Sequence, residues 1–539
     1  MLKLITYFCF LLIITFQFTN AQTLDNSFDL DGYLGSPPSI NSNGNKGTGN
    51  NLVIQPDGKI VVAIGDYGTD LHTYRYNIDG TYDDSYGTAG TAGQFCGEST
   101  ITYDLKVDPD DKIVAIGKTQ YCIDGVCGAY QFLMSRYLPN GELDLSFGVD
   151  GEIRSSEIFP GGLYAYGIRV HALNNGKYMI AGKGPDHKPF VARLLNNGYR
   201  DSTFAIDGVF TDVFGTGFGY VDLFVDELGR SYSLLEHERD NYIFKLSENG
   251  ELIPTFGIDG RLLFSVSNRD YPKSIFVNPD ESIVICGDHQ WNEPDDPDFM
   301  WGGLARTNRG YVTFINPDGT LNTELEDGSI EVHFDTDSST FVQKIIRLNT
   351  NRYMIAGKTM HEFGGKFREI AFVAQIDNNG QYCTDFNEVG YMMFDYGQLA
   401  ASGWTGKIAS FVDIDFTESG EVYLTGDYNP TAGSPTRKLF VLKLKDVEMS
   451  AIESDLGLNQ NSTSAFTIYP NPVTDHFTIE INEAADYALF SIEGKEMQSG
   501  KLQEGTNLLE INKPHQTSAA IVQITTVSGD VLHQKIIFE

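Results

Sequence analysis

Leu143-Asp144-Leu145-Ser146-Phe147-Gly148-Val149-Asp150-Gly151 is the clearest copy of a motif that recurs about every sixty residues along the chain. Four further copies occupy residues 24–32, 82–90, 200–208 and 252–260, and two degenerate copies occupy residues 321–328 and 382–390. A fixed period of this length indicates a stacked or circular array, in which no unit buries its apolar face alone. The motif therefore predicts one large repeat domain of seven units over residues 22–445.

Each unit contains four strand signals, which in the third unit lie at residues 152–158, 166–173, 177–182 and 189–195. Tight turns such as Asn174-Asn175-Gly176-Lys177 join the second strand to the third, and their residue types tolerate the positive φ of hairpins. The third strand is nearly all apolar, which indicates burial on both faces. We expect this strand to end at a glycine in six units, namely Gly65, Gly117, Gly182, Gly287, Gly357 and Gly426.

Four antiparallel strands repeated radially form a propeller blade. The expected fold is all-β, a seven-bladed β-propeller of about sixty-residue repeats. If the strand after each Asp-Gly is the outer edge of the preceding blade, the strand after Gly32 would pair beside the last three strands, which end at residues 440–444. That pairing would close the ring. A right-handed β-solenoid is the competing architecture, and four hairpin-linked strands per unit fit it poorly.

A basic side chain recurs at one position of the fourth strand, and in three units an aspartate follows eight residues later. The basic residues are Arg75, Arg136, Arg193, Lys245 and Lys443, and the aspartates are Asp83, Asp144 and Asp201. We expect each arginine to pair with the aspartate of its own unit. Because partly exposed ion pairs stabilise little, Arg136→Ala is expected to lower the melting temperature only slightly.

The repeats over residues 24–445 resemble the delta-60 repeat family of bacterial surface proteins. Aromatic-rich strands at residues 132–137 and 190–194, each followed by a turn glycine, accompany the motif. Units four to six depart from the pattern, with Pro254 in place of the aspartate and Leu325 in place of the aromatic residue. The resemblance implies a propeller-like fold and no defined chemistry.

The chain has 539 residues and a formal net charge of −35. This charge argues against nucleic acid as a partner, because phosphate binding needs a positive surface. It indicates solubility outside the cell, with divalent-cation binding as the alternative. Residues 1–21 have the basic start, apolar core and small final residues of a secretory signal, and they are short for a membrane anchor. No later segment is apolar enough to cross a bilayer, so we expect a secreted or surface-attached protein.

Five cysteines follow residue 21, and two of them, Cys122 and Cys127, bracket an Asp-Gly turn. A local disulfide across that turn is expected in an oxidising compartment. Two free thiols are the alternative, and a zinc site is weaker because no second close pair of cysteines exists.

A polar linker, residues 446–464, precedes a small C-terminal domain, residues 465–539. Alternating strands at 477–481, 487–491, 508–511, 520–526 and 531–538 predict a β-sandwich. Its Tyr469-Pro470-Asn471-Pro472 sequence, the turn at Gly494 and the final strand with Lys535 resemble the sorting domain read by the type IX secretion system. At residues 518–520 the sequence departs from that family, with Ser-Ala-Ala where Gly-Xaa-Tyr is usual. The resemblance implies delivery across the outer membrane of a Gram-negative bacterium, with the secretion machinery as partner. An adhesive module of the same fold is the alternative.

The loops between the third and fourth strands of each unit share one face of the ring with the loops between the first and second. These loops are long and varied, and binding residues usually collect on such surfaces. The 3–4 loops are expected to contain His72, His187, His237, His289 and His361. The longest insertion combines Trp291 and Trp301 with Asp295, Asp296 and Asp298 and follows His289. Aromatic planes beside carboxylates suit carbohydrate stacking, or a cation such as calcium held by oxygen ligands.

Catalytic motifs are missing: the chain has no Gly-Xaa-Ser-Xaa-Gly, no His-Glu-Xaa-Xaa-His and no P-loop. We therefore expect a non-enzymatic exported protein, without a cofactor, that binds a glycan or another protein through its variable face. A secreted carbohydrate-active enzyme is the alternative, with Asp296 or Asp298 paired with an acid of a neighbouring blade. A structural surface component without a ligand is the third possibility.

Overall fold

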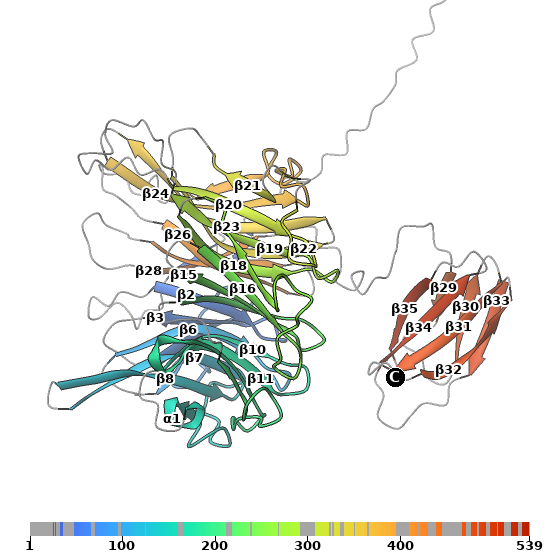
Figure 1. Cartoon of the computed structure of the whole chain (residues 1–539), viewed down its shortest axis with the longest axis horizontal. Coiled ribbons are helices and arrows are strands. Elements are labelled where there is room, and N and C mark those ends of the chain that lie inside the picture. The colour runs from blue at the N-terminus through green and yellow to red at the C-terminus, as the bar shows by residue number, and fades with distance from the viewer. Residues whose placement is uncertain are drawn as a thin grey trace, which may run out of the picture. The chain divides into compact units, whose positions relative to one another are not determined.

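The computed structural model (Figure 1) describes residues 25, 27–28, 33–35, 48–65, 71–94, 99–123, 126–159, 165–211, 218–237, 240–267, 269–290, 308–322, 325, 328–334, 339–349, 351–363, 366–394, 409–417, 421–428, 438–444, 466–469, 476–481, 484–491, 496–503, 505–510, 519–526 and 531–537. Contacts divide the chain into two compact units, of which the larger holds the repeats and the smaller holds the C-terminal residues from Met449 onward. The expected secretory signal, residues 1–21, and the linker, residues 446–464, lie outside the described residues.

The larger unit contains seven four-stranded antiparallel sheets, which we call blades 1 to 7. Blades 1 to 3 are β2 (Thr48–Ile54), β3 (Ile60–Gly65), β4 (Leu71–Tyr76) and β5 (Thr91–Gln94); β6 (Ser99–Val107), β7 (Ile113–Ile123), β8 (Val126–Tyr137) and β9 (Glu152–Arg154); and β10 (Tyr166–Ala172), β11 (Tyr178–Lys183), β12 (Pro189–Leu194) and β13 (Val209–Thr211). Blades 4 and 5 are β14 (Gly219–Val225), β15 (Ser231–His237), β16 (Asp240–Leu246) and β17 (Arg261–Phe264); and β18 (Asp270–Val277), β19 (Ile283–Gln290), β20 (Asn308–Ile315) and β21 (Ser329–Val332). Blades 6 and 7 are β22 (Ser339–Asn349), β23 (Arg352–Phe363), β24 (Lys366–Asp377) and β25 (Tyr391–Phe394); and β26 (Ala409–Phe416), β27 (Val422–Tyr428), β28 (Lys438–Leu444) and β1 (Tyr33–Gly35).

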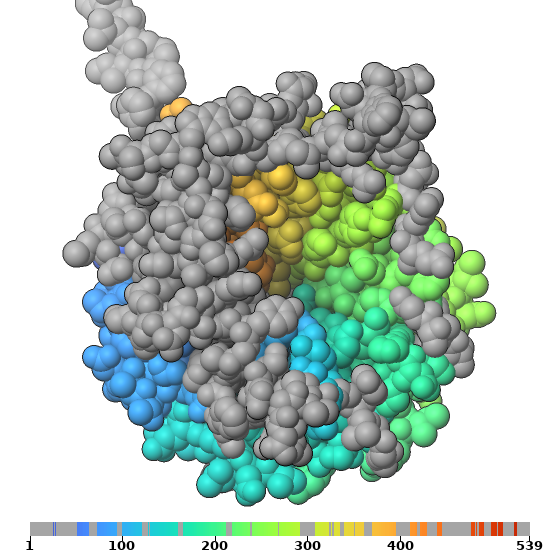
Figure 2. Space-filling view, turned by 90° about the vertical axis from the view of Figure 1, so that its left-hand side faces the viewer, coloured from blue at the N-terminus to red at the C-terminus, as the bar shows by residue number. Residues whose placement is uncertain are grey.

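The first strands of neighbouring blades contact one another, as β26 with β2, β2 with β6, β6 with β10, β10 with β14 and β14 with β18. The blades are thus arranged around an axis lined by their first strands, and Figure 2 shows their colours following one another around the ring. The predicted all-β propeller fold is confirmed.

The two ends of the repeat domain meet in blade 7, as predicted. β1 pairs antiparallel with β28, and Tyr33 lies opposite Leu442. The amide of Asp25 donates to the main-chain O of Lys443 at 3.0 Å, and the ammonium of Lys443 lies 3.4 Å from Asp25 Oδ2. The N-terminal residues therefore supply the outer strand of the last blade.

The second strand of each blade is the third strand of the corresponding repeat. β3 ends at Gly65 as expected, but in the other five strands the glycine marks a bulge and the strand continues beyond it. β7 and β23 continue for several residues beyond Gly117 and Gly357. A Cβ at Gly117 would lie 1.9 Å from the main-chain O of Ile101, and the register of β6 against β7 shifts between Thr102 and Asp104. The first strand therefore bulges toward the glycine, and this close approach excludes a side chain.

A strand predicted at residues 152–158 is instead β9 followed by a single helical turn, α1 (Ser155–Ile158). The turn begins where Ser155 Oγ accepts a hydrogen bond from the amide of Phe132 at 2.8 Å. Glu157 then accepts a hydrogen bond from the amide of Arg154 at 2.8 Å, which satisfies a donor at the start of the turn. These two side-chain bonds favour the turn over a longer edge strand.

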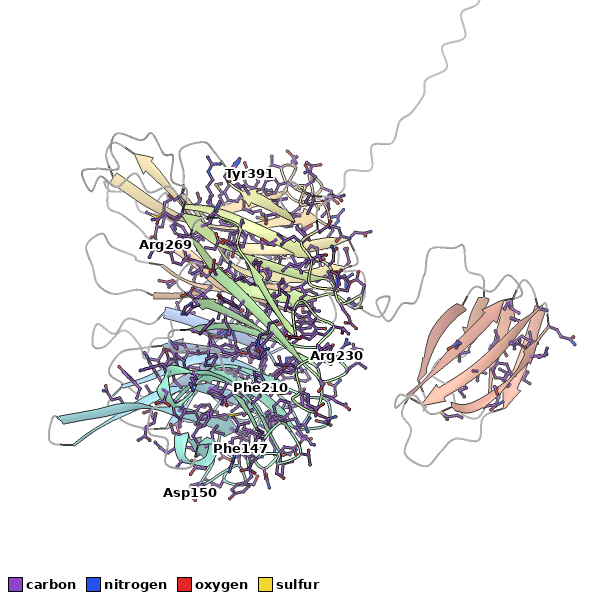
Figure 3. The ribbon with its side chains drawn as sticks, in the orientation of Figure 1. Phe147, Asp150, Phe210, Arg230, Arg269 and Tyr391 are labelled. Atoms are coloured by element: carbon purple, nitrogen blue, oxygen red, sulfur yellow. The ribbon has the colours of Figure 1, made fainter. Side chains whose placement is uncertain are left out.

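The recurring motif ties each blade to the next. Asp144 Oδ1 accepts hydrogen bonds from the amide and hydroxyl of Ser146, which fixes the turn. Phe147 is fully buried and lies edge-to-face against Tyr178 of the following blade. The amide of Gly148 donates to the main-chain O of Asn197, also in the following blade, at 2.8 Å. Figure 3 shows Asp150, which begins the Asp-Gly turn, at the edge of the unit and Phe147 further inside.

The predicted arginine–aspartate pairs are confirmed in three blades. The distance from arginine Nε to aspartate Oδ2 is 2.8 Å, 2.9 Å and 2.8 Å in the pairs Arg75–Asp83, Arg136–Asp144 and Arg193–Asp201. Two expectations were wrong. The pairs are buried rather than partly exposed. In blade 4 it is Ile253, not Pro254, that occupies the aspartate position, because its amide donates to the main-chain O of Lys245.

The C-terminal unit consists of two antiparallel sheets. One contains β29 (Phe466–Tyr469), β30 (His476–Ile481) and β33 (Gly505–Glu510), and the other contains β32 (Glu496–Leu502), β31 (Ala485–Ser491), β34 (Ala519–Thr526) and β35 (Val531–Ile537). A single hydrophobic cluster includes Ile479 of the first sheet with Leu489 and Ile524 of the second. Tyr469 ends β29 and Lys535 lies in β35, whereas Pro470, Asn471, Pro472 and Gly494 lie outside the described residues.

Candidate ligand-binding site

Only one residue of the predicted ligand site, His289, is among the described residues. It lies in β19 and is buried at 3 % exposure, so it is part of the blade rather than an exposed ligand group. Trp291, Asp295, Asp296, Asp298 and Trp301 lie outside the described residues, and their role stays a prediction.

His187 lies in the loop between β11 and β12, as predicted, but three other histidines lie in strands, because the strands of these hairpins are longer than expected. His72, His237 and His361 lie in β4, β15 and β23, and His187 lies in the short 3₁₀ segment η3 (Pro185–His187). The ring of His237 stacks on Phe218, with the two centroids 4.2 Å apart. Among the residues that the structure describes, no three His, Cys, Asp or Glu side chains are grouped to hold a metal ion.

The two cysteines of the predicted disulfide lie directly opposite each other across the hairpin of β7 and β8. Their side chains are not among the described ones, so the bond itself stays a prediction. Cys286 and Cys383 are free cysteines, and Cys286 is fully buried.

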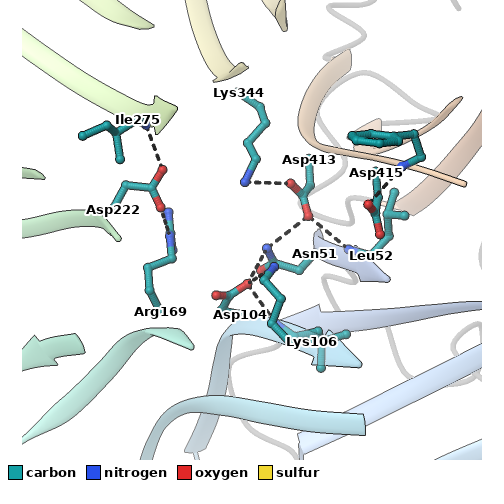
Figure 4. Close-up of polar contacts among 12 residues, drawn as sticks. Asn51, Leu52, Asp104, Lys106, Arg169, Asp222, Ile275, Lys344, Asp413 and Asp415 are labelled. Atoms are coloured by element: carbon teal, nitrogen blue, oxygen red, sulfur yellow. Dashed lines mark hydrogen bonds and ion pairs between the residues drawn. The ribbon is translucent and has the colours of Figure 1, made fainter. Parts of the chain in front are cut away.

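A polar ring on the axis was not predicted from the sequence. The residue that follows the bulge of each first strand faces the axis, and we call this set the axial ring. Its members, from blade 1 to blade 7, are Asn51, Asp104, Arg169, Asp222, Ser274, Lys344 and Asp413. Figure 4 shows the side chains of six of them converging from separate strands.

The three acids of the axial ring each cross to the next blade. Asp104 Oδ2 accepts a hydrogen bond from the amide of Val170 at 3.0 Å, and Asp222 Oδ2 accepts one from the amide of Ile275 at 3.0 Å. Asp413 Oδ2 accepts the amide of Leu52 at 3.3 Å, which joins the last blade to the first. These bonds satisfy the amide groups that the bulges leave unpaired.

Basic side chains balance these acids. Arg169 Nε donates to Asp222 Oδ1 at 2.6 Å, and the ammonium of Lys344 lies 3.2 Å from Asp413 Oδ1. Burial alone would lower the pKa of Lys344, but the attraction of Asp413 and Asp222 outweighs it and raises that pKa. The pKa of Asp222 is lowered, because its contacts with Arg169, Lys344 and the amide of Ile275 outweigh burial. Lys344 and Asp222 are therefore charged near neutral pH.

A second polar layer lies two residues further along the same strands. Asp415 accepts hydrogen bonds from the amides of Ile54 and Phe416, and burial raises its pKa to about 6. Burial and the neighbouring Lys106 lower the pKa of His171 to about 4. In blades 4 and 5 this layer is aromatic, with the rings of Phe224 and Phe276 edge-to-face at 5.2 Å.

One face of the ring bears the hairpins that join the second and third strands of each blade. Near this face, the side chain of Lys118 is surrounded by aromatic rings. The ammonium of Lys118 lies 4.3 Å from the ring centroid of Tyr130, 5.4 Å from that of Tyr166 and 5.6 Å from that of Tyr103. All four side chains are half-buried. These rings offer flat apolar surface beside a positive charge. Figure 2, which views this face, shows it hollowed near the centre of the ring.

Blade 5 holds a buried carboxyl group just before the predicted binding loop. Asp288 accepts a hydrogen bond from Asn308 Nδ2 at 3.0 Å, and Lys273 lies 3.9 Å from its other oxygen. Among the described residues that other oxygen, Oδ1, has no hydrogen-bond partner. Burial raises the pKa of Asp288 to about 6, against the attraction of Lys273. This carboxyl group can therefore exchange a proton near neutral pH.

A sequence signal for the axial ring did exist. In blades 2, 3, 5, 6 and 7 its members lie thirteen residues before the glycine of the next strand, as Asp104 lies before Gly117. Each is a polar residue in the first strand of its blade. Counting back from that glycine would have located a polar side chain on the axis.

Two family models match parts of the chain. A model described as "Secretion system C-terminal sorting domain" matches residues 467–539. A model described as "Domain of unknown function (DUF5122) beta-propeller" matches residues 55–86 and 109–147. No curated protein matches the chain.

Similar solved structures include the propeller of Dos1, the polysaccharide lyase Uly1 and the β-propeller domain of Nup133 from Vanderwaltozyma polyspora. They are 8 %, 11 % and 9 % identical, with TM-scores of 0.38, 0.42 and 0.32. The alignments cover 74 %, 74 % and 71 % of this chain and 78 %, 90 % and 91 % of the other chains. Likeness at this level has no bearing on activity.

Among the described residues, no helix has the length and apolar character needed to cross a membrane. The propeller match covers parts of the first two repeats, and the sorting-domain match covers the C-terminal strands. The chain is a propeller-like repeat protein with a type IX secretion sorting domain, which exports it to the cell surface or the medium.

Proposed function

We propose that this exported protein binds a carbohydrate near the axis, on the face that bears the hairpins between the second and third strands of each blade, and that it catalyses no reaction. The observation that supports the proposal best is the group of three tyrosine rings around Lys118. Half-exposed aromatic rings can stack on the C–H faces of sugar rings, and nearby charged groups can bind hydroxyl groups.

The position of these residues also supports the proposal. Tyr103 and Tyr166 belong to first strands, β6 and β10, whereas Lys118 and Tyr130 belong to the long hairpin of β7 and β8. Figure 1 shows the strands of this hairpin extending outward beyond the neighbouring strands. A site of this kind rests on rigid strands and is bordered by segments that differ between blades, as is typical of binding faces.

Hydrolysis of a carbohydrate is the second candidate, and Asp288 is the observation that favours it. A carboxyl group with a pKa of about 6 suits a general acid near neutral pH. Glycoside cleavage needs a second carboxylate, and Glu236 is close enough to Asp288 to raise its pKa further. A hydrolase would therefore lose activity on substitution of either acid.

A glycan array probed with the chain lacking residues 1–21, with and without calcium, tests the proposal. Tyr166→Ala should lose binding without a change in melting temperature, and the Trp291→Ala/Trp301→Ala double variant tests the predicted loop. Tyr199→Ala is the matched control, because Tyr199 is an exposed tyrosine in the turn after β12. The absence of binding to every glycan would overturn the proposal in favour of a protein ligand or a structural role.

Incubation of any bound glycan with the wild-type protein decides between binding and hydrolysis. Recovery of the intact oligosaccharide is expected. Cleavage that Asp288→Asn abolishes would replace the binding proposal with the hydrolase.

A further inference from the structure

We propose that the axial site binds an acidic carbohydrate, with its lysine and arginine side chains contacting carboxylate or sulfate groups of the ligand. This inference rests on the proposed function and specifies its ligand class. It follows from the ion pairs near the axis, in which the acidic side chain is buried and the basic side chain is partly exposed to solvent.

In four ion pairs made by basic side chains of first strands, the basic partner is the more exposed one. The side chains of Lys106, Lys273, Lys344 and Arg169 are 37 %, 32 %, 24 % and 23 % exposed. Their acidic partners, Asp104, Asp288, Asp413 and Asp222, are 3 % to 6 % exposed. Within each pair, a ligand on the axis therefore reaches the ammonium or guanidinium group more readily than the carboxylate.

The acids cannot turn toward a ligand. Asp104, Asp222 and Asp413 each accept a hydrogen bond from the main chain of the next blade, as described above. Rotation of any of these side chains would leave a buried amide without a partner, which costs about 1–3 kcal/mol. These three acids are thus held against the main chain of the next blade, and the cations remain the groups that can contact a ligand.

Lys118 shows that these cations do more than neutralise buried aspartates. Among the described residues, no carboxylate pairs with its ammonium group, which lies against Tyr103, Tyr130 and Tyr166. A lysine beside aromatic rings matches a sugar ring that has an acidic substituent, since the ring can stack while the substituent pairs with the ammonium group.

The chain as a whole has a charge of −35, which would repel an acidic ligand at long range. At physiological salt, exposed charges more than about 8–10 Å away are largely screened. Inside the hollow, the acids closest to these cations are their buried partners, so the cations are the more exposed charged groups. Acidic carbohydrate is favoured over acidic protein because the tyrosine rings provide stacking surface for sugar rings.

Calorimetric titration of the full chain without residues 1–21 tests the inference. The probes are a uronic-acid oligosaccharide, a sulfated oligosaccharide and a neutral one of equal length. The two acidic arms distinguish carboxylate from sulfate as the preferred group, and tighter binding of at least one acidic probe than of the neutral one is expected. Added salt should weaken that binding.

Lys118→Gln and Lys273→Gln should each weaken binding of the acidic probe roughly two- to fivefold, the range expected for an exposed ionic contact. Lys59→Gln is the matched control, because Lys59 is 29 % exposed and also pairs with a buried aspartate, Asp83, but lies at the turn end of its blade. It should leave binding unchanged.

Equal binding of neutral and acidic probes would overturn the charge inference and leave carbohydrate binding intact. Binding of none of the three probes, together with a glycan array without signal, would overturn both. Equal loss in the Lys59→Gln control would show a general charge effect and would also overturn the axial assignment.

Discussion

Arg136 and Asp144 form a buried ion pair within one repeat, with arginine Nε 2.9 Å from aspartate Oδ2. The same guanidinium reaches the next blade, where Nη1 donates to the main-chain O of Asn196 at 2.5 Å and to the hydroxyl of Tyr178 at 2.9 Å. It also lies 4.5 Å from the ring centroid of Phe147. One side chain therefore connects the recurring motif, its own blade and its neighbour.

Arg136→Ala should lower the free energy of unfolding by about 3–5 kcal/mol, the cost of removing one partner of a buried pair. Lys112, 3.0 Å from Asp144, remains and limits the loss. Urea denaturation followed by tryptophan fluorescence measures the change. Arg136→Lys should fall between wild type and alanine, because lysine keeps the charge but not the fork of donors. A loss below 1 kcal/mol for the alanine variant would contradict the assignment.

The propeller could be predicted from the sequence because its signals are local and repeated. The Asp-Xaa-Ser-Phe-Gly pattern encodes an aspartate-capped turn and a buried ring, and both recur in blade after blade. The burial of Arg136 was missed because its surroundings come partly from the next repeat. Spacing within one unit does not show what the neighbouring unit adds.

The candidate site was harder to predict for the same reason. The axial ring combines single residues from seven strands, so no stretch of sequence contains it. Loop composition led instead to Trp291 and Trp301, and it placed histidines such as His289 in loops although they belong to strands. Strand length was underestimated because the recurring glycine of these strands, such as Gly117 in β7, marks a bulge and not the end of the strand.

Gly117→Ala should destabilise the protein strongly. The added Cβ would lie 1.9 Å from the main-chain O of Ile101, so β6 would have to move away from β7. Such overpacking costs about 3 kcal/mol, and the displaced strand carries Asp104 of the axial ring. Gly229→Ala is the control, since its Cβ would lie 3.6 Å from Cβ of Glu248 and only its positive φ opposes the change. Similar melting temperatures for both variants would refute the bulge as a constraint.

Asp288 should make stability depend on pH between about 4 and 6. Its folded-state pKa of about 6 lies above the value of about 3.9 expected for an unfolded chain. The folded state therefore holds the proton more tightly, and the stability this provides is fully present below about pH 4 and is lost as pH rises through 6. Unfolding free energies measured from pH 4 to pH 7 should decline by about 2–3 kcal/mol for this group.

Asp288→Asn removes the titrating group, so its pH curve should be flatter than that of wild type over the same range. Asp415, whose pKa is also raised to about 6 by burial, should keep part of the decline. Glu142→Gln, in the turn after β8, serves as the exposed control and should reproduce the wild-type curve. A variant curve parallel to wild type would show that Asp288 does not titrate in this range.

Removal of residues 465–539 should prevent export without unfolding the repeats. The two units have separate hydrophobic clusters, and ring closure depends on β1 and β28 rather than on the C-terminal strands. In a Gram-negative host with type IX secretion, the truncated protein should therefore accumulate inside the outer membrane with an unchanged melting temperature. Fractionation and surface proteolysis of cells measure its location. Surface exposure of the truncated protein would show that the sorting domain is dispensable, whereas a lowered melting temperature would show that the two units stabilise each other.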